Sequence, residues 1–262
     1  DKLILPKEGD KEERGLFIGR RREMFIGRRR EKARVLPKFM AKTPILITGQ
    51  GGIGKTAMAE HLVHRLIAAN PKTMPVPFDE NTRNIGEIMD ALKEILHDAD
   101  NFDAILKADQ FEKAMDRLGF LVSEVKKTFD PVFIFDNLED FQEEPGGGFS
   151  PEFADIAEVI GYLLKRGRYH MILTCRYPVP GFGGLEVLNL DEVSLNDYWK
   201  RLFYFDAGNI RRYLEESRGS AGSGPPVSYK DMVTLQYRLL GGNYRVLEFF
   251  NRFARERPEQ IK

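Results

Sequence analysis

Residues 49–56 have the residue types and the spacing of a phosphate-binding loop. They read Gly-Gln-Gly-Gly-Ile-Gly-Lys-Thr, so Gly49, Gly54, Lys55 and Thr56 fulfil the pattern G-x-x-x-x-G-K-[ST]. The glycines allow backbone turns that a Cβ atom would forbid, so that successive N–H groups can face one anion. Lys55 offers a charge to the β- and γ-phosphates, and Thr56 offers a hydroxyl group to Mg²⁺. This stretch therefore predicts a site for a nucleoside triphosphate with Mg²⁺.

The segments on either side of the loop support the same interpretation. Residues 45–48 (Ile-Leu-Ile-Thr) are typical of a buried strand, and residues 57–69 have helical spacing. A helix that begins after the loop adds about half a positive charge at its N-terminus, where phosphates bind. An incidental glycine-rich turn does not require this order of strand, loop and helix. The residues expected to contact the nucleotide here are Gly49, Gly51, Gly52, Ile53, Gly54, Lys55, Thr56 and Ala57.

A second group of candidate residues follows the apolar run at residues 132–135. This run predicts a buried parallel strand, and Asp136 comes directly after it. In proteins with a phosphate-binding loop, an acid at such a strand end holds Mg²⁺ directly or through water. Asp136 is therefore the second expected metal ligand, with Thr56. Glu139 and Asp140 are either positioned to place an attacking water or exposed to solvent at the start of the next helix.

Another buried strand is predicted at residues 170–176, and its last residue is Arg176. An arginine at the end of a strand in a nucleotide-binding sheet can reach the γ-phosphate. It would then distinguish ATP from ADP, because only the triphosphate gives it a partner. The alternative is an arginine that lies in solvent. The expected catalytic residues are thus Lys55, Asp136, Glu139 and Arg176.

The N-terminal region contains a basic repeat. The sequence Phe-Ile-Gly-Arg-Arg-Arg-Glu occurs at residues 17–23 and again at residues 25–31. It is interpreted as a nucleic-acid patch, as a solvated basic helix start, or, because it shortly precedes the phosphate loop, as part of the nucleotide site. Residues 28–40 have helical spacing, and Pro37 is expected to kink or end that helix.

Composition limits the class of protein. Among 262 residues, 42% are hydrophobic and 31% are charged, so the chain can bury a core. Lys plus Arg and Asp plus Glu number 40 each, so the net charge does not indicate nucleic acid as a partner. The single cysteine, Cys175, excludes an internal disulfide framework and favours a reducing, cytoplasmic compartment. No apolar run approaches the length of a membrane span, so no membrane partner is expected.

Strands and helices are expected to alternate through the first two thirds of the chain. Further strands are predicted at residues 74–78 and 185–190, and helices at residues 85–96 and 111–125, with a polar connection at 98–103. This alternation predicts an α/β fold in which helices cover both faces of a mostly parallel sheet. Ligands of such sheets bind at the carboxyl ends of the strands.

The sequence changes character at Ser194, after which only helical spacing remains. Helices are predicted at residues 195–203, 210–216, 228–240 and 243–255, with a Gly/Ser/Pro-rich linker at 218–227. The expected domains are residues 1–43, a basic segment; 44–193, the nucleotide-binding domain; and 194–262, a small all-helical domain.

Together these motifs resemble the nucleotide-binding core of the STAND class, the signal-transduction ATPases with numerous domains, of the bacterial type. This class is related to the AAA+, NB-ARC and NACHT proteins. The resemblance includes the phosphate loop, the strand ends at residues 136–139 and 173–176, and residues 240–245 (Leu-Gly-Gly-Asn-Tyr-Arg). It implies that a Phe-Ile-Gly-Arg segment, in either copy of the repeat, lies against the adenine. The implied base contacts are Ile26, Gly27, Arg28 and Tyr244.

Two positions depart from the family pattern. The family usually has proline where this chain has Tyr244, which either stacks on the adenine or leaves that contact unmade. Many members have a second acid directly after the metal-binding Asp, but here that residue is Asn137. Because an amide cannot accept a proton as a base, hydrolysis is expected to be slow unless Glu139 takes that role.

The resemblance implies a regulatory switch that binds ATP or ADP with Mg²⁺, in which slow hydrolysis is coupled to domain rearrangement. The implied partners are an effector and a sensor domain of a longer polypeptide, of which this chain is expected to be a fragment. It is expected to be a monomer in isolation and to oligomerise on activation. The alternatives are a nucleic-acid-stimulated motor and a small-molecule or nucleotide kinase. A GTPase is excluded because the chain lacks an Asn-Lys-x-Asp segment.

Overall fold

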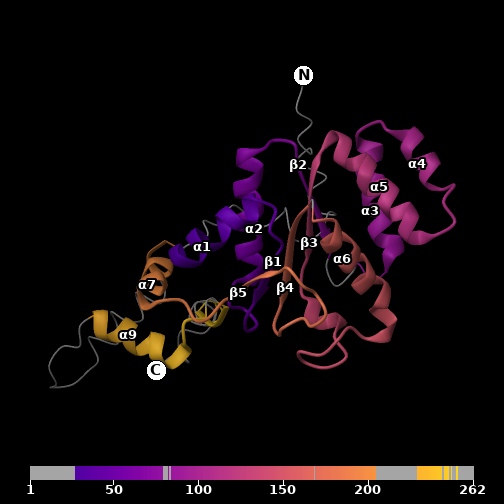
Figure 1. Cartoon of the computed structure of the whole chain (residues 1–262). Helices are drawn as coiled ribbons and strands as arrows, with labels where there is room; N and C mark the ends of the chain where they lie inside the picture. The colour runs from indigo at the N-terminus through magenta and orange to yellow at the C-terminus, as the bar shows by residue number, and fades with distance from the viewer. Residues whose placement is uncertain are drawn as a thin grey trace, which may run out of the picture. The chain divides into compact units, whose positions relative to one another are not determined.

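Figure 1 shows the computed structural model of the chain, which describes most but not all of its residues. Residues of the N-terminal repeat before Gly27, the base-contact candidates Ile26 and Tyr244, and the predicted helix at 210–216 lie outside the described part. The described residues are 27–78, 82, 84–167, 169–204, 229–243, 245–247, 249 and 252.

The described residues form two compact units. The sheet unit comprises residues 33–48 and 55–189. The loop–helix unit comprises residues 27–32, 49–54 and the described residues after 189. The glycines of the phosphate loop therefore belong to the loop–helix unit, whereas Lys55 and Thr56 belong to the sheet unit.

The sheet unit is built on five parallel strands in the order β2-β3-β4-β1-β5. Strand β4 lies between β1 and β3, so the carboxyl ends of these three strands are adjacent. This sheet confirms the predicted α/β fold. The strands are β1 (Ile45–Thr48), β2 (Thr73–Phe78), β3 (Asp130–Phe135), β4 (His170–Cys175) and β5 (Glu186–Asn189).

Helices cover both faces of this sheet (Figure 1). Side chains of one strand alternate between the two faces, and one set joins a large apolar core that includes Phe133, Phe135 and Leu173. That core is completed by the buried faces of α3, α5 and α6. The helices are α1 (Arg29–Met40), α2 (Lys55–Ala69), α3 (Ile85–Asp98), α4 (Phe102–Ala108), α5 (Ala114–Thr128) and α6 (Ala154–Arg166), and the short 3₁₀ turns are η1 (Leu138–Phe141) and η2 (Pro151–Phe153).

Helix α1 matches the predicted helical stretch at residues 28–40, and of the two alternatives for Pro37 the helix does not end there. The buried side chains of Val35 and Phe39 hold both sides of the proline in the core. The predicted polar connection at residues 98–103 is shorter, because α4 begins at Phe102. The side chain of Asn101 accepts a hydrogen bond from the backbone of the first turn of α4, an N-cap that the sequence analysis missed.

The loop–helix unit contains α7 (Leu195–Tyr204) and α9 (Tyr229–Leu240). Their contact includes an edge-to-face pair in which the ring centroids of Tyr198 and Tyr237 lie 5.3 Å apart. The Tyr237 hydroxyl donates to the carbonyl oxygen of Val193 at 2.7 Å, which fixes α9 against the segment before α7. Across the described part of the chain, no helix combines the length and the apolar content needed to cross a membrane.

Candidate functional site

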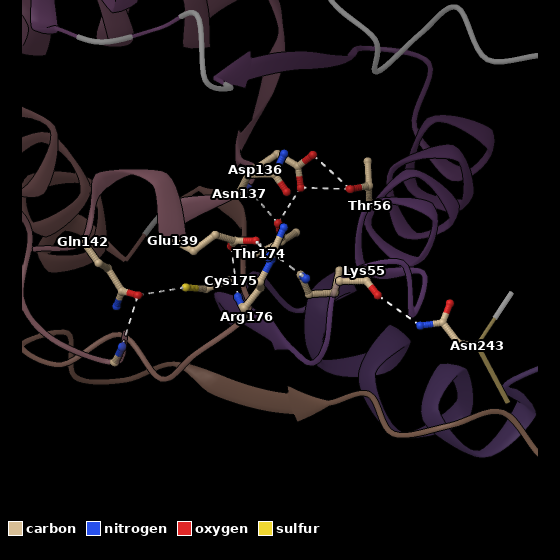
Figure 2. Close-up of polar contacts among 12 residues, drawn as sticks. Lys55, Thr56, Asp136, Asn137, Glu139, Gln142, Thr174, Cys175, Arg176 and Asn243 are labelled. Carbon is tan, nitrogen blue, oxygen red and sulfur yellow. Dashed lines mark hydrogen bonds and ion pairs between the residues drawn. The ribbon is translucent and has the colours of Figure 1, made fainter. Parts of the chain in front are cut away.

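Two threonine hydroxyl groups hold the carboxylate of Asp136 at the carboxyl end of β3 (Figure 2). Thr56, in the first turn of α2, donates from Oγ1 to Asp136 Oδ2 at 3.0 Å. Thr174, near the end of β4, donates from Oγ1 to Asp136 Oδ1. The Thr174 hydroxyl in turn accepts a 3.0 Å hydrogen bond from the backbone N–H of Asn137. The predicted metal ligands Thr56 and Asp136 therefore lie together.

The environment of Asp136 fits a divalent cation. The residue is only 7% exposed, and burial raises the pKa of its carboxyl group, although the two hydroxyl hydrogen bonds oppose that shift. A buried carboxylate beside a hydroxyl oxygen is a hard ligand set of the kind that Mg²⁺ prefers. Among the described residues no cluster of three or more His, Cys, Asp or Glu forms a metal cage.

The second acid of this region, Glu139, lies in η1 and faces two basic residues (Figure 2). Its Oε1 accepts a 2.9 Å hydrogen bond from Arg176 Nε, and its Oε2 accepts one of 3.0 Å from the Arg176 backbone. Lys55 Nζ lies 3.9 Å from the same Oε1. The Glu139 side chain is only 8% exposed, whereas Asp140 faces solvent. Of the two acids after the strand, Glu139 is thus the one that lies at the site.

Lys55 and Arg176 differ in their surroundings. The Lys55 side chain is 6% exposed, and burial lowers the pKa of its amine against the opposing charge of Glu139. The Arg176 side chain is 52% exposed, so its guanidinium group remains accessible to a ligand. Both cations therefore share one carboxylate, and a more highly charged anion can compete with it for both.

A left-handed residue between the two acids explains why Glu139 reaches this place. Asn137 has φ = +57°, a conformation that Asn tolerates better than most residues, and it precedes η1. The turn places the side chain two residues later against Lys55. The sequence indicated only that Asn137 cannot act as a base, and its role in the backbone was not predicted.

In the loop–helix unit, two residues near the start of the last described helical segment contact the phosphate loop. Asn243 Nδ2 donates to the carbonyl oxygen of Gly51 at 3.1 Å. Gly52 has φ = +77°, and a Cβ atom there would lie 2.6 Å from Arg245 Cβ. Neither Asn243 nor Arg245 was among the predicted site residues. The sequence feature that could have indicated these two residues is the pair Gly241-Gly242, which precedes an Asn that can cap a helix and a basic residue.

Arg28, predicted as a base contact, has protein atoms as its partners. Its Nη2 donates to the carbonyl oxygens of Ile53, at 3.0 Å, and of Asp191, at 2.7 Å. Its Nη1 lies 3.2 Å from Glu31 Oε1, and the side chain is 1% exposed. Gly27, with φ = +83°, lies so close to Asp197 that a Cβ atom would collide with it.

Comparison with known proteins gives a consistent result for the fold. No protein-family model matches the chain. A stretch of 145 residues is 33% identical to the chaperone protein ClpB of Wolinella succinogenes; this match covers 54% of the chain and 15% of ClpB. The chain therefore corresponds to only a small part of that relative.

Two solved structures are similar in fold. The Orc1 protein of Aeropyrum pernix, determined in complex with DNA, has a TM-score of 0.51 at 15% identity, over 90% of this chain and 61% of that one. A Walker-type ATPase of Pyrococcus abyssi has a TM-score of 0.50 at 12% identity, over 90% and 69% of the two chains. The fold is that of P-loop ATPases.

Proposed function

We propose that this chain is an ATP/ADP-binding switch module with slow ATP hydrolysis. The observation that carries the proposal is the group of side chains at the carboxyl ends of β3 and β4 and at the start of α2. Thr56 contacts Asp136, and Glu139 contacts both Lys55 and Arg176. Lys55 and Thr56 are themselves the last two residues of the G-x-x-x-x-G-K-[ST] sequence. A nucleoside triphosphate with Mg²⁺ matches the charges and the oxygen ligands of this group of side chains.

Each residue has a distinct proposed role. Lys55 neutralises the β- and γ-phosphates, and its low exposure keeps the amine from being fully hydrated, which strengthens that attraction. Thr56 and Asp136 hold Mg²⁺, which would neutralise charge on the phosphates when bound. Asp136 gains most from the cation, because burial disfavours its bare charge.

The contacts of Glu139 support a switch rather than a fast motor. Asn137 cannot accept a proton, so Glu139 is the candidate base, and in this structure its carboxylate is bonded to Arg176. A γ-phosphate would compete with Glu139 for Arg176 and Lys55, whereas ADP would leave the Glu139–Arg176 pair intact. Release of Glu139 would then depend on the triphosphate, and hydrolysis would wait for that release.

The wider role rests on the resemblance to the STAND class. We propose that nucleotide exchange or hydrolysis changes the arrangement of the nucleotide-binding domain, residues 44–193, and the helical domain, residues 194–262. Effector and sensor domains of the same polypeptide would read that change, and activation would lead to a homo-oligomer. The base contacts that this resemblance implies are Ile26, Gly27, Arg28 and Tyr244.

Ligand-induced stabilisation tests the binding site. At a nucleotide concentration of a hundred times its dissociation constant, binding to the folded state adds about 2.7 kcal/mol to the free energy of unfolding. ATP or ADP with Mg²⁺ should therefore raise the melting temperature of the wild type, and Lys55→Ala should lose most of that rise. Lys93→Ala, which removes an α3 lysine that pairs with Asp109, is the control and should keep it. An equal rise in Lys55→Ala would refute the proposed site.

A nucleic-acid-stimulated ATPase is the second candidate, because the structurally similar Orc1 was determined in complex with DNA and the N-terminal repeat is basic. Measuring ATP turnover with and without DNA or RNA separates the two functions. The switch proposal expects slow turnover that nucleic acid changes little. Strong stimulation by DNA or RNA would instead favour the motor.

A further inference from the structure

Two side chains that are distant in sequence from the phosphate loop bind its backbone carbonyl groups. The guanidinium group of Arg28 donates to the carbonyl oxygen of Ile53 at 3.0 Å. The side-chain amide of Asn243 donates to the carbonyl oxygen of Gly51 at 3.1 Å. Arg28, Asn243 and the loop all belong to the loop–helix unit.

The planarity of the peptide bond connects these carbonyl groups to the N–H groups of the next residues. In a trans peptide unit the C=O and the N–H point in opposite directions, and the described residues contain no cis bond. The unit that carries the Ile53 carbonyl also carries the Gly54 N–H, and the unit of the Gly51 carbonyl carries the Gly52 N–H. Each N–H therefore points away from the side chain that holds its carbonyl.

The glycine conformations suit an anion-binding arrangement of these N–H groups. Gly52 has φ = +77° and Gly54 has φ = +99°, so each lies in a region that favours glycine. Ile53, between them, donates from its N–H to the Gln50 carbonyl oxygen at 3.3 Å, which closes a turn. Such alternation of backbone conformations forms concave N–H sites for anions.

We infer that Arg28 and Asn243 are positioning residues that orient the Gly54 and Gly52 N–H groups toward the phosphate chain of the ligand. This inference rests on the proposed function of nucleotide binding. Neither side chain contacts the phosphates in this arrangement. Each fixes one peptide plane, so the loop does not have to reorganise when the anion enters.

Arg28 is well suited to this task because it cannot easily move. Its side chain is 1% exposed, and its guanidinium group also bonds the Asp191 carbonyl oxygen at 2.7 Å and lies beside Glu31. Its backbone N–H donates to Asp197 Oδ2 at 3.0 Å. The planar guanidinium group binds the two carbonyl oxygens and the Glu31 carboxylate together, whereas the ammonium group of a lysine is a single point that cannot reach all three.

The amide of Asn243 is oriented by a second hydrogen bond. Its Oδ1 accepts from the backbone N–H of Arg245 at 3.0 Å, an Asx turn that directs the NH₂ group to the Gly51 carbonyl. A serine at this position can keep the cap on Arg245, but its side chain is too short to reach Gly51 at the same time. Asn243→Ser therefore separates capping from loop positioning.

The inference is tested by comparing ADP with pyrophosphate, a ligand that has phosphates but no adenine base. Affinities for ADP and for pyrophosphate are measured by isothermal titration calorimetry with the wild type, Arg28→Lys and Asn243→Ser. Both variants should bind both ligands about tenfold more weakly, which corresponds to the loss of one charge-assisted or neutral hydrogen bond that organises the loop. The two ligands should lose affinity by similar factors, because the effect acts on the phosphates that they share.

Arg34→Lys is the matched control for Arg28→Lys. Arg34 lies in α1, the helix that begins directly after Arg28, and it also donates from a guanidinium nitrogen to a backbone carbonyl, that of Val187 at 2.9 Å. This variant should bind ADP and pyrophosphate as the wild type does. If Arg28→Lys does not fold, Asn243→Ser still tests the inference through its own peptide plane.

Three results would overturn the inference. The first is that both variants bind both ligands as tightly as the wild type does. The second is that the variants lose affinity for ADP but not for pyrophosphate, which would assign Arg28 to the adenine base. The third is that Arg34→Lys loses affinity to the same degree, which would indicate a general effect of weakening α1. Failure of the proposed function itself is distinct, because then the wild type would bind neither ligand.

Discussion

Two acids at opposite ends of one strand have contrasting partners. Asp130 begins β3, and its carboxylate meets Lys42 Nζ at 2.8 Å, Asn70 Nδ2 at 3.2 Å and His170 Nε2 at 3.5 Å. Asp136 follows the other end of β3, and hydroxyl groups provide its hydrogen bonds. Within the described part of the chain, a lysine thus lies close to the first acid, and no cation makes a comparable contact with the second.

This contrast separates an acid that is paired within the fold, Asp130, from an acid that we propose to bind a cation, Asp136. The charge of Asp130 is balanced by Lys42, so it stabilises the amino edge of the sheet without any ligand. Among the described residues, no cation forms such a contact with Asp136, whose carboxylate is held by the hydroxyl groups of Thr56 and Thr174. Burial without a paired cation is costly in a folded protein, and it is expected where a bound cation supplies the charge.

The largest expected effect is on metal-dependent binding. Asp136→Asn keeps the size of the side chain but removes the anionic oxygen that would hold Mg²⁺. We expect it to weaken Mg²⁺-ATP binding by about a hundredfold, near 2.7 kcal/mol, while Asp130→Asn leaves the affinity unchanged. Calorimetric titration with and without Mg²⁺ measures both. Equal losses in the two variants would remove the distinction between the acids.

The second largest effect is expected on the stability of the protein when Asp130 is replaced. Asp130→Asn leaves Lys42 without its carboxylate and should lower the free energy of unfolding by about 2 kcal/mol, measured by urea denaturation. Asp109→Asn breaks the exposed pair with Lys93 and serves as the control, with a smaller change. If Asp130→Asn were as stable as the wild type, Asp130 would not have the structural role assigned to it.

A smaller effect of opposite sign is expected for Asp136. Without nucleotide or Mg²⁺ at neutral pH, Asp136→Asn should raise the free energy of unfolding by about 1 kcal/mol, because it removes a buried charge.

This gain should depend on pH in a definite direction. The pKa of Asp136 is raised in the folded state, so the contribution of this one carboxyl group to stability is fully present below its ordinary pKa of 3.8 and is lost as the pH rises through the raised value. The advantage of Asp136→Asn should therefore shrink in acid. Denaturation curves across pH measure it, and a pH-independent difference would contradict the assignment.

The smallest effect is on discrimination between nucleotides. Arg176→Ala removes a half-exposed guanidinium group that we expect to reach the γ-phosphate, so the ratio of ATP to ADP affinity should fall about three- to tenfold. Binding itself should persist through Lys55. Arg166→Ala, which removes an arginine that stacks on Tyr162, is the control. An unchanged ratio in Arg176→Ala would exclude Arg176 as the nucleotide sensor.

Local sequence patterns were sufficient to predict the fold and to place Asp136 after a buried strand. The apolar run before Asp136 predicted a buried strand, and the structure confirms that β3 ends at Phe135. The glycine spacing predicted the loop, because a backbone that must turn around an anion requires glycine at defined positions. These features depend on neighbours in sequence, so the sequence alone contains them.

Contacts between distant residues were decided by the tertiary structure. The strand order β2-β3-β4-β1-β5 places the end of β4 between those of β1 and β3, which brings Thr174 and Arg176 to Asp136 and Glu139. A left-handed turn at Asn137 decides which of the following acids faces Lys55. Neither the order nor the turn follows from residue periodicity.

The parallel α/β fold and the position of Asp136 at a strand end could be predicted from local sequence patterns. The different partners of Asp130 and Asp136, and the hydrogen bond from Arg28 to the carbonyl oxygen of Ile53, became visible in the three-dimensional structure. The physical reason is that burial and pairing of a charge depend on side chains brought together from far along the chain. Asp130 and Asp136 are the same residue type, so the residue type alone could not distinguish their roles.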